Sequence, residues 1–538
     1  MKKVTSIPLK NILIFLLIFI ILSAVYYPAI QGYYGHHDDY YFWIKTPNGL
    51  HVQHEFVVYL GRFLGAELQT MAGRFIHSLR DLNYLRFVSV FCISLCAFSC
   101  YFWFRPYFPN AISACLFAIL IFTLPPFEAI VGWAICFYIS IALFLASCAA
   151  HFAFQSSLIK PFCKSPINKY SLLASLFLFS SLAIYQFAAM FYWVMVCFFI
   201  LSSSRKPYGE LRHQILKFFC IGLGTIAIYA FFLNIINPYN VDLNPNETMT
   251  SYNPYTIKQN YLLKLDWFIM EPLFNSLNLW DIIPHNIDVA VTIFLFILVT
   301  YLFSLIKITW LSAKRQTTVP SGRITFNLLI TISLILLTFM PGLFNVGLAP
   351  FYRCSSALTT LVVIGLLWAI NEWLSILKKS LRDFVLTAIV VWGCLFGMIQ
   401  ANFNVYYYRA LPSNLEVTFL KKILQKQDTT KFQRIYIRRP PHLMIRRYDE
   451  FANLTMHTEQ DIPWLLKCIF EELGEKTVFK SIYPNITNGF NPQPPPSDKP
   501  TLIINTYWLY HFYEKLFFSI SPSVAKTVPL HDDQQSAH

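Results

Sequence analysis

The stretch that decides the fold is "ILIFLLIFIILSAVYYPAI", residues 12–30, which runs directly into "QGYYGHHDDYYFW", residues 31–43. The first part is apolar and about as long as the 20 residues that a helix needs to cross the hydrocarbon core of a bilayer. No A-x-A cleavage signal follows, so we expect an uncleaved first membrane helix. The second part places two adjacent acids, Asp38 and Asp39, directly beside that helix.

The same apolar pattern recurs along the 538 residues of the chain, of which 56% are hydrophobic and only 13% are charged. Soluble domains carry about twice that charged fraction. We therefore predict an all-α polytopic membrane protein with about 11 transmembrane helices. The predicted spans are 11–31, 83–104, 110–125, 130–150, 170–186, 187–203, 215–236, 287–311, 323–343, 353–376 and 383–402.

Lysine and arginine gather on one side of this predicted bundle. Loops on that side hold groups such as Lys160, Lys164 and Lys169, whereas the short loops on the other side hold Arg353. Because cytoplasmic loops carry the excess of Lys and Arg, this bias predicts a cytoplasmic N-terminus. It also places the C-terminus on the outer side.

The pattern divides the chain into a transmembrane domain, 1–402, and an extracytoplasmic C-terminal domain, 403–538. The transmembrane domain has two large outer loops, at about 32–82 and 237–286. The C-terminal region alternates the strand-like runs "FQRIYIRR" and "TLIINTYWLY" with the helix-like run "IPWLLKCIFEEL". This alternation predicts a small α/β domain on the outer face.

The net charge of +14 does not indicate a nucleic-acid partner, because most of the basic residues lie at helix ends. The twelve cysteines are scattered through apolar runs without a CxxC pair, so we expect small buried side chains. The basic segment "IYIRRPPHLMIRRYDE", with Arg438, Arg439, Arg446 and Arg447, could contact anionic lipid or glycolipid. A solvated basic face is the alternative.

The acids Asp38 and Asp39 have two interpretations. They could be an acidic pair in a solvated loop. They could instead form a site at the membrane surface, where a carboxylate takes the proton of an attacking hydroxyl or the pair holds a divalent cation beside a phosphate. His36 and His37 could extend such a site, although HHDD is not a recognised metal pattern.

Four arginines of the first outer loop run against the charge bias of the bundle. A guanidinium group suits phosphate binding, and exposed loop charge is the competing interpretation for two or three of them. Arg62 is the candidate, because the preceding Gly61 lets the backbone approach closely. The four are Arg62, Arg74, Arg80 and Arg86.

Other candidate residues stand at helix ends. Arg353, at the mouth of a helix, could bind an anionic group or extend to the interface. Glu128, in a short outer turn, could pair with an arginine or contact substrate. Tyr185 and Gln186 lie where two predicted spans meet, in one long helix or a re-entrant pair, and we expect them to hydrogen-bond inside the bundle.

Several blocks of the sequence, in this order, resemble one known family. It is the type II O-antigen glucosyltransferase family, the bacterial serotype-conversion enzymes, which are membrane glycosyltransferases of the GT-C type. The blocks lie between about residues 12 and 425. They are "HDDYYFW", "YLGRFLGAEL", "LRFVSV", "LPPFEAIVGWAICFYISIALFLAS", "LAIYQFAAMFYWVMV", "GLAPFYRCSSAL" and "QANFNVYYYRALPSNLEVTFLKKIL".

The resemblance implies an enzyme of the bacterial inner membrane that moves a sugar, glucose in the first instance, from polyprenyl phosphate to O-antigen or another surface glycan. It implies that Asp38 and Asp39 are catalytic, with Asp38 favoured as the base, and that Arg62 or Arg353 holds the phosphate. The further residues that we expect to contact substrate are Glu128, Tyr185, Gln186 and His37. No cofactor is implied with certainty, and a divalent cation at Asp38 and Asp39 stays open.

The expected partners are the lipid-linked sugar donor, a lipid-linked or surface polysaccharide acceptor and membrane lipid. Three other classes of function compete with the glycosyltransferase, and one of them is a non-catalytic envelope protein whose C-terminal domain binds partners. A transporter or flippase of lipid-linked glycans would place its ionisable residues within the membrane and often show internal repeats. A polysaccharide polymerase would use arginines of the outer loops more than an aspartate pair.

Overall fold

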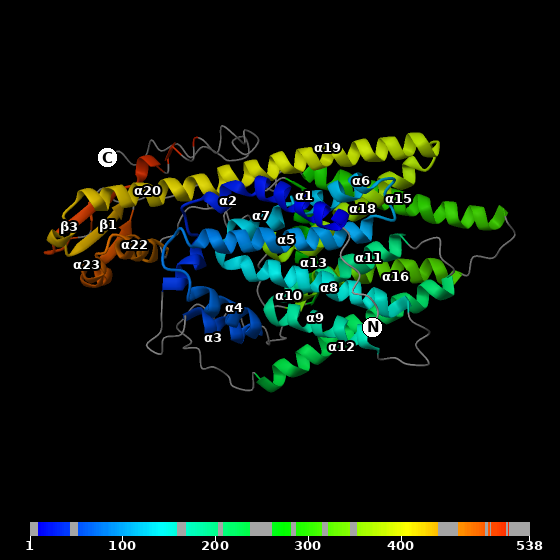
Figure 1. Cartoon of the computed structure of the whole chain (residues 1–538), viewed down its shortest axis with the longest axis horizontal. Coiled ribbons are helices and arrows are strands. Elements are labelled where there is room, and N and C mark those ends of the chain that lie inside the picture. The colour runs from blue at the N-terminus through cyan, green and yellow to red at the C-terminus, as the bar shows by residue number, and fades with distance from the viewer. Residues whose placement is uncertain are drawn as a thin grey trace.

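The chain forms a long helical bundle with a small sheet at one end (Figure 1). The computed structural model describes residues 9–43, 52–158, 168–202, 208–236, 261–280, 287–314, 321–344, 352–438, 461–489, 493–494, 496–509, 511–512 and 515. The first half contains α1 (Leu9–Val25), α2 (Tyr27–Gln31), α3 (Val52–Tyr59), α4 (Phe63–Gly73), α5 (Leu82–Phe104), α6 (Ala111–Ile121), α7 (Pro125–Gly132), α8 (Phe137–Leu158), α9 (Lys169–Ile184), α10 (Gln186–Ala189), α11 (Phe191–Ser202) and α12 (Tyr208–Ile236). The second half contains α13 (Tyr261–Phe268), α15 (Ile287–Lys314), α16 (Ser321–Thr338), α17 (Met340–Phe344), α18 (Ser356–Leu374), α19 (Lys379–Val405), α20 (Leu411–Lys426), α22 (Asp461–Glu472) and α23 (Lys476–Ile482).

Five helices within the described ranges are long and apolar enough to cross a membrane, and the bent pair α6 and α7 makes a sixth if it is one span. The five are Leu82–Phe104, Ala134–Ser157, Leu211–Leu233, Ser356–Leu374 and Lys379–Lys426. The other predicted spans also overlap helices, but their apolar parts are shorter, as in Leu9–Val25 and Lys169–Ile184. The described part of the chain is therefore mostly helical with five or six candidate membrane-spanning helices, whereas the larger number of spans stays a prediction.

Two breaks in the bundle have a local cause in the sequence. The axes of α6 and α7 differ by 63°. Pro125 and Pro126 stand at the start of α7, where proline is accommodated because the first N–H groups of a helix have no partner within it. At Tyr185 the backbone is extended, with φ −162° and ψ 110°, so α9 and α10 are separate helices rather than one long helix.

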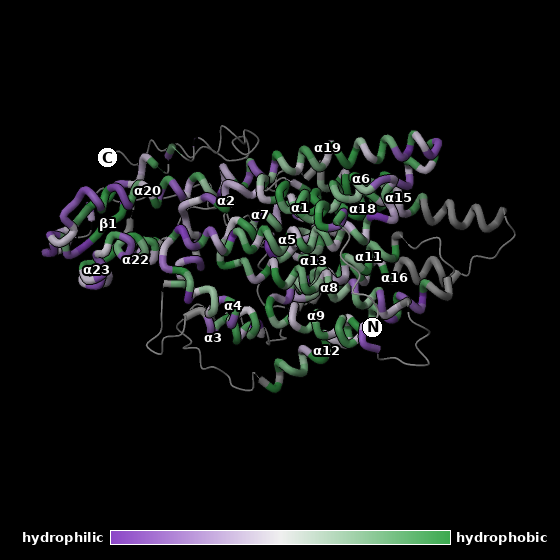
Figure 2. Tube along the Cα trace, in the orientation of Figure 1, coloured by the Kyte–Doolittle hydropathy of each residue, from purple (hydrophilic) through white to green (hydrophobic). Residues whose placement is uncertain are grey.

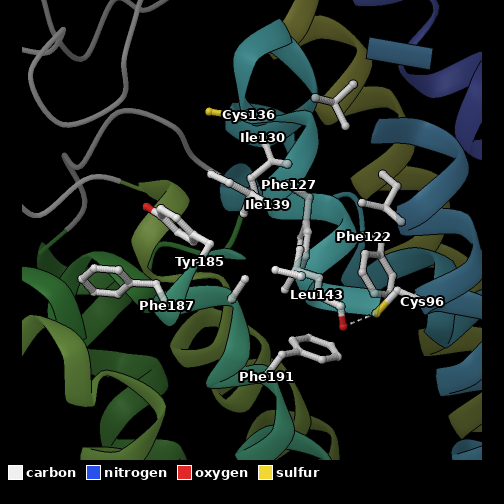
Figure 3. Close-up of a cluster of buried hydrophobic side chains, with 14 of the residues drawn as sticks. Cys96, Phe122, Phe127, Ile130, Cys136, Ile139, Leu143, Tyr185, Phe187 and Phe191 are labelled. Carbon is white, nitrogen blue, oxygen red and sulfur yellow. Dashed lines mark hydrogen bonds between the residues drawn. The ribbon is translucent and has the colours of Figure 1, made fainter. Parts of the chain in front are cut away.

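The interior of the bundle is one large cluster of buried apolar side chains. Figure 3 shows part of it, where the Phe122 ring lies 4.6 Å from that of Phe127 and 6.1 Å from that of Phe191. The Cys96 thiol donates to the backbone oxygen of Leu143 at 3.7 Å. The described cysteines have free thiols and most are buried, which confirms their interpretation as small apolar side chains.

The outer surface of the bundle is also apolar. Large side chains such as Phe231, Trp392 and Ile399 are exposed on α12 and α19. In Figure 2 hydrophobic residues follow the whole bundle, whereas hydrophilic residues gather at the end that carries α20, α22, α23 and β1. Such an apolar surface fits lipid contact.

The C-terminal region contains a three-stranded parallel sheet in the order β2-β1-β3. The strands are β1 (Arg434–Arg438), β2 (Ile486–Gly489) and β3 (Thr501–Asn505). The predicted small α/β arrangement is therefore present, with α22 at the predicted helix. The boundary predicted at residue 402 falls inside a continuous helical stretch, Lys379–Lys426, in which the π-helical turn η6 (Tyr406–Ala410) joins α19 to α20.

One polar cluster ties the C-terminal region to the first loop. Glu472 accepts hydrogen bonds from the Lys421 ammonium at 2.7 Å, from the Tyr33 hydroxyl, and from the backbone N–H of Leu79 at 3.0 Å. Burial alone would raise the pKa of Glu472, but these donors outweigh it and hold that pKa below its ordinary value. Charged Glu472 therefore stabilises the contact between α22 and the loop.

The substitution Glu472→Gln should weaken this contact by about 2 kcal/mol, because hydrogen bonds to a charged group contribute more than neutral ones. The measurement is hydrogen exchange of the α22 amides in the purified protein. Glu471→Gln is the matched control, since its ion pair with Lys476 is 3.6 Å long and the Lys476 side chain is exposed, so the pair should contribute less than about 1 kcal/mol. Equal exchange in both variants would contradict this role of Glu472.

The same contact should depend on pH. A carboxylate whose pKa is lowered in the folded state stabilises that state above its ordinary pKa and loses this contribution as the pH falls through the lowered value. Protection of α22 should therefore decrease below about pH 4.3. Glu472→Gln should remove this part of the pH dependence.

Candidate active site

The aspartate pair opens a short 3-10 helix, η1 (His37–Trp43), directly after α2. The Asp39 N–H donates to the His36 carbonyl at 2.8 Å, which closes the first turn. Asp39 is completely buried, whereas Asp38 is half-buried. Neighbouring positions in η1 thus give the two acids different surroundings.

Asp39 joins three segments of the chain. Its carboxylate accepts from the backbone N–H of His36 at 3.0 Å, of Ile135 at 2.6 Å and of Ala134 at 3.4 Å. The last two belong to η2 (Ala134–Cys136), the short turn that leads into α8. A carboxylate is favourable here because N–H groups at the start of a helix have no partner within the helix.

Arg86 of α5 supplies the positive charge beside Asp39. Its Nη2 lies 3.6 Å from Asp39 Oδ2, and both side chains are fully buried. The guanidinium also donates to the carbonyl of Tyr34 at 2.8 Å and lies 3.8 Å from the Tyr34 ring centroid. Arg86 therefore fixes the loop around η1 rather than awaiting a phosphate.

The burial of Asp39 affects its protonation. Burial raises the pKa of Asp39 to about 6, against the lowering effect of Arg86 and of the backbone N–H groups of Ile135, His36 and Ala134. This pKa is still below neutral pH, so the carboxylate is mainly charged at pH 7.

Asp38 faces a different set of groups. It lies within electrostatic range of Arg353 in η5 (Tyr352–Cys354) and of Tyr138 in α8. The Arg353 guanidinium stacks on the Trp133 ring, 4.3 Å from its centroid, and the Trp133 indole N–H donates to the His36 carbonyl at 2.9 Å. The predicted residues Asp38 and Arg353 are thus brought together from distant parts of the sequence.

Arg62 lies in the same region. Its guanidinium is 4.4 Å from the centroid of the Tyr185 ring, and its Nε donates to the side-chain oxygen of Gln186 at 2.9 Å. The charges of Arg62, Arg353 and Asp38 all act on Tyr138. Arg62 and Arg353 are therefore the candidate phosphate-binding residues.

Gly61 has a backbone conformation that lets the loop pack closely against the Tyr229 side chain. Its φ is +81°, a value that favours glycine, and a Cβ there would lie 2.8 Å from the Tyr229 hydroxyl. That hydroxyl donates to the Gly61 carbonyl at 2.9 Å, and the Gln186 amide donates to Leu60 O at 2.7 Å. These bonds hold the backbone next to Arg62.

Tyr185 and Gln186 hydrogen-bond inside the bundle, as expected. The Tyr185 hydroxyl is 3.3 Å from Cys354 Sγ, next to Arg353 in the sequence, and the Gln186 amide also bonds the Tyr229 hydroxyl at 2.9 Å. Figure 3 shows Tyr185 beside the apolar cluster that contains Phe187. Tyr185 is buried and Gln186 is half-buried.

Glu128 does not join this cluster by any described contact. It is completely buried at the start of α7 and accepts from the Asn404 amide at 3.2 Å. Both Glu128 and Arg409 lie within electrostatic range of Tyr26. This placement fits the predicted pairing with an arginine in the core better than contact with substrate.

The remaining candidates have simpler positions. Arg74 and Arg80 are exposed, as the solvated-charge interpretation expects. The side chain of His37 lies outside what the structure describes, as do Arg439, Arg446 and Arg447. Arg438 stacks on the Tyr507 ring at 5.3 Å.

The aspartate pair is poorly suited to hold a divalent cation. Both oxygens of Asp39 accept backbone N–H groups, and the positive charge of Arg86 stands beside it. Within the described part of the chain, His, Cys, Asp and Glu side chains form no group of three or more that could hold a metal ion. We therefore derive no step through a metal.

Sequence reasoning missed several residues of this region. Trp133 looks like one more apolar residue of its run, and Arg409 is a single isolated charge. Both nevertheless lie in blocks that carry the family resemblance. Arg409 is fully buried and packs against Gly132, where a Cβ would lie 2.6 Å from its Cδ. The signal was present for Arg409, because a lone arginine at the end of a long apolar run is costly without a partner.

Comparison with known proteins gives no assignment. No model of a protein family matches the chain, and no curated protein is significantly similar to it.

The two aspartates should differ in their effect on stability. Asp39→Asn should lower the free energy of unfolding by about 3 kcal/mol, because an amide N–H₂ would face backbone donors and Arg86 would lose its buried counter-charge. Asp38→Asn, at a half-buried position, should change it by less than about 1 kcal/mol. Thermal unfolding of the detergent-solubilised protein at pH 7 measures both. A larger loss for Asp38→Asn would contradict the division of roles.

Proposed function

We propose that this protein is a membrane glycosyltransferase of the GT-C type that uses a polyprenyl-phosphate sugar as donor. The observation that carries the proposal is the division of labour in the aspartate pair. Asp39 is locked by Arg86 and the start of α8, and it holds Asp38 within electrostatic range of Arg353. A half-buried acid within electrostatic range of the Arg353 guanidinium suits a reaction in which a hydroxyl loses a proton and a phosphate leaves.

The reaction is a single displacement at the sugar. A hydroxyl oxygen of the acceptor attacks the anomeric carbon as the bond between that carbon and the phosphate oxygen breaks. Asp38 accepts the hydroxyl proton, and polyprenyl phosphate leaves with the bonding electrons. Attack from the opposite face inverts the anomeric centre. Arg62 and Arg353 hold the phosphate, since a guanidinium binds phosphate oxygens with two parallel hydrogen bonds.

The finer parts of the proposal rest on the apolar runs and charge bias, for the spans and termini, and on the family resemblance, for the bacterial membrane, the sugar and the acceptor. The chain crosses the bacterial inner membrane about 11 times, with a cytoplasmic N-terminus and a periplasmic C-terminal region. The donor sugar is glucose and the acceptor is O-antigen or another surface glycan. Tyr185 and Gln186 orient Arg62 in this scheme, through the ring contact and the hydrogen bond described above.

The direct test offers polyprenyl-phosphate glucose, labelled in the sugar, to membranes that contain the protein and a surface-glycan acceptor. Asp38→Asn should lower transfer by about 10²- to 10⁴-fold, the usual contribution of a general base. Glu67→Gln is a matched control, because Glu67 is an exposed acid paired only with His54 among its described contacts. That variant should transfer sugar as the wild type does.

Two results would overturn the proposal. Transfer that persists in Asp38→Asn would show that Asp38 is not the general base. Label that moves across the membrane without reaching any glycan would indicate a flippase. Arg353→Lys gives an independent reading, because a lysine keeps the charge and loses the planar fork. The expected result is a clearly raised KM for the donor with only a small loss of thermal stability.

A further inference from the structure

A cavity of about 820 Å³ lies between the first loop and the C-terminal region. Its walls come from η1, from the segment after α4, and from α22 and α23. Both aromatic and cationic side chains line the cavity. Those that matter here are Phe42, Trp464, Tyr483, Lys467, Lys476 and Lys480.

The charge of this cavity is predominantly positive. Three ammonium groups stand against one carboxylate, Glu471, which lies 3.6 Å from Lys476. Lys480 is exposed on α23, and Lys467 is half-buried on α22. An anionic group entering the cavity would therefore meet a favourable field with little cost of dehydrating buried cations.

A neighbouring cavity of about 600 Å³ repeats the pattern. It shares His77 with the first cavity and contains Arg80, Lys421 and Lys422 against Glu472. Because the two cavities adjoin at His77 and both are lined by basic side chains, we call them together the basic groove. Two adjoining cavities with several cations in each suit a chain that carries several anionic groups better than a single small anion.

The position of the groove favours a glycan over a lipid headgroup. It lies at the hydrophilic end of the molecule, away from the apolar surface of the bundle (Figure 2). Phe42, in its wall, belongs to the same short helix as Asp38. A ligand in the groove would thus contact the element that carries the proposed base.

We propose that the basic groove binds an anionic saccharide chain, one with carboxylate or phosphate groups, as the acceptor. The aromatic rings offer flat faces for the apolar sides of sugar rings, and the lysines pair with the anionic groups. This inference rests on the proposed glycosyltransferase function, because it names the acceptor of that reaction. The binding step itself can be measured without catalysis.

The test uses the full-length protein in nanodiscs of phosphatidylcholine. Fluorescent hexagalacturonate is the anionic probe, and maltohexaose of equal length is the neutral one. The double substitution Lys467→Gln with Lys480→Gln should weaken hexagalacturonate binding about tenfold and flatten its salt dependence. The control is Lys431→Gln with Lys499→Gln, which removes the same charge from exposed positions outside both cavities and should bind as the wild type does.

Any of three results would contradict the proposal that the basic groove binds an anionic saccharide. The first two are equal binding of maltohexaose and equal affinity in both double variants. The third is displacement of the probe by glycerol phosphate at an equal concentration of anionic groups, which would indicate lipid headgroups. Asp38→Asn separates this inference from the catalytic proposal, since it should bind hexagalacturonate normally while losing transfer. Transfer that persists in Asp38→Asn would refute the catalytic role, and the binding comparison would still decide the groove.

Discussion

The structure around η1 depends on one buried carboxylate. Asp39 is inaccessible to solvent, so its charge is tolerable only because Arg86 and the first N–H groups of the α8 span surround it. The same contact sets the position of the first loop relative to α5 and α8. The position of the neighbouring Asp38, half-buried within electrostatic range of Arg353, follows from this arrangement.

Much of the fold could be predicted from the sequence because membrane helices leave a strong signal. Long apolar runs and the bias of lysine and arginine located the helices of the bundle, and alternation in the C-terminal region located β1, α22 and β3. The strand Ile486–Gly489 was not predicted, because four residues with one strong β-former carry little pattern. Pro125 and Pro126 explain why the helix breaks there, but the angle between α6 and α7 does not follow from the local sequence.

The candidate site was predictable only as a list of residues. Two adjacent aspartates look alike in a sequence, and the difference between them comes from partners far along the chain, such as Arg86 and Ile135. The same limit applies to arginines, since Arg86 contacts Asp39 whereas Arg62 and Arg353 both lie near Tyr185. Burial and long-range pairing, which no local pattern contains, separate these roles.

The continuous helix from Lys379 to Lys426 has a geometric consequence. Its 48 residues correspond to about 70 Å at 1.5 Å per residue, more than twice the hydrocarbon thickness of about 30 Å. The helix is therefore long enough to cross the bilayer and continue to the sheet (Figure 1). In that arrangement the length of the helix would set the distance of the C-terminal region from the membrane. It would also set the distance at which a bound polymer would lie.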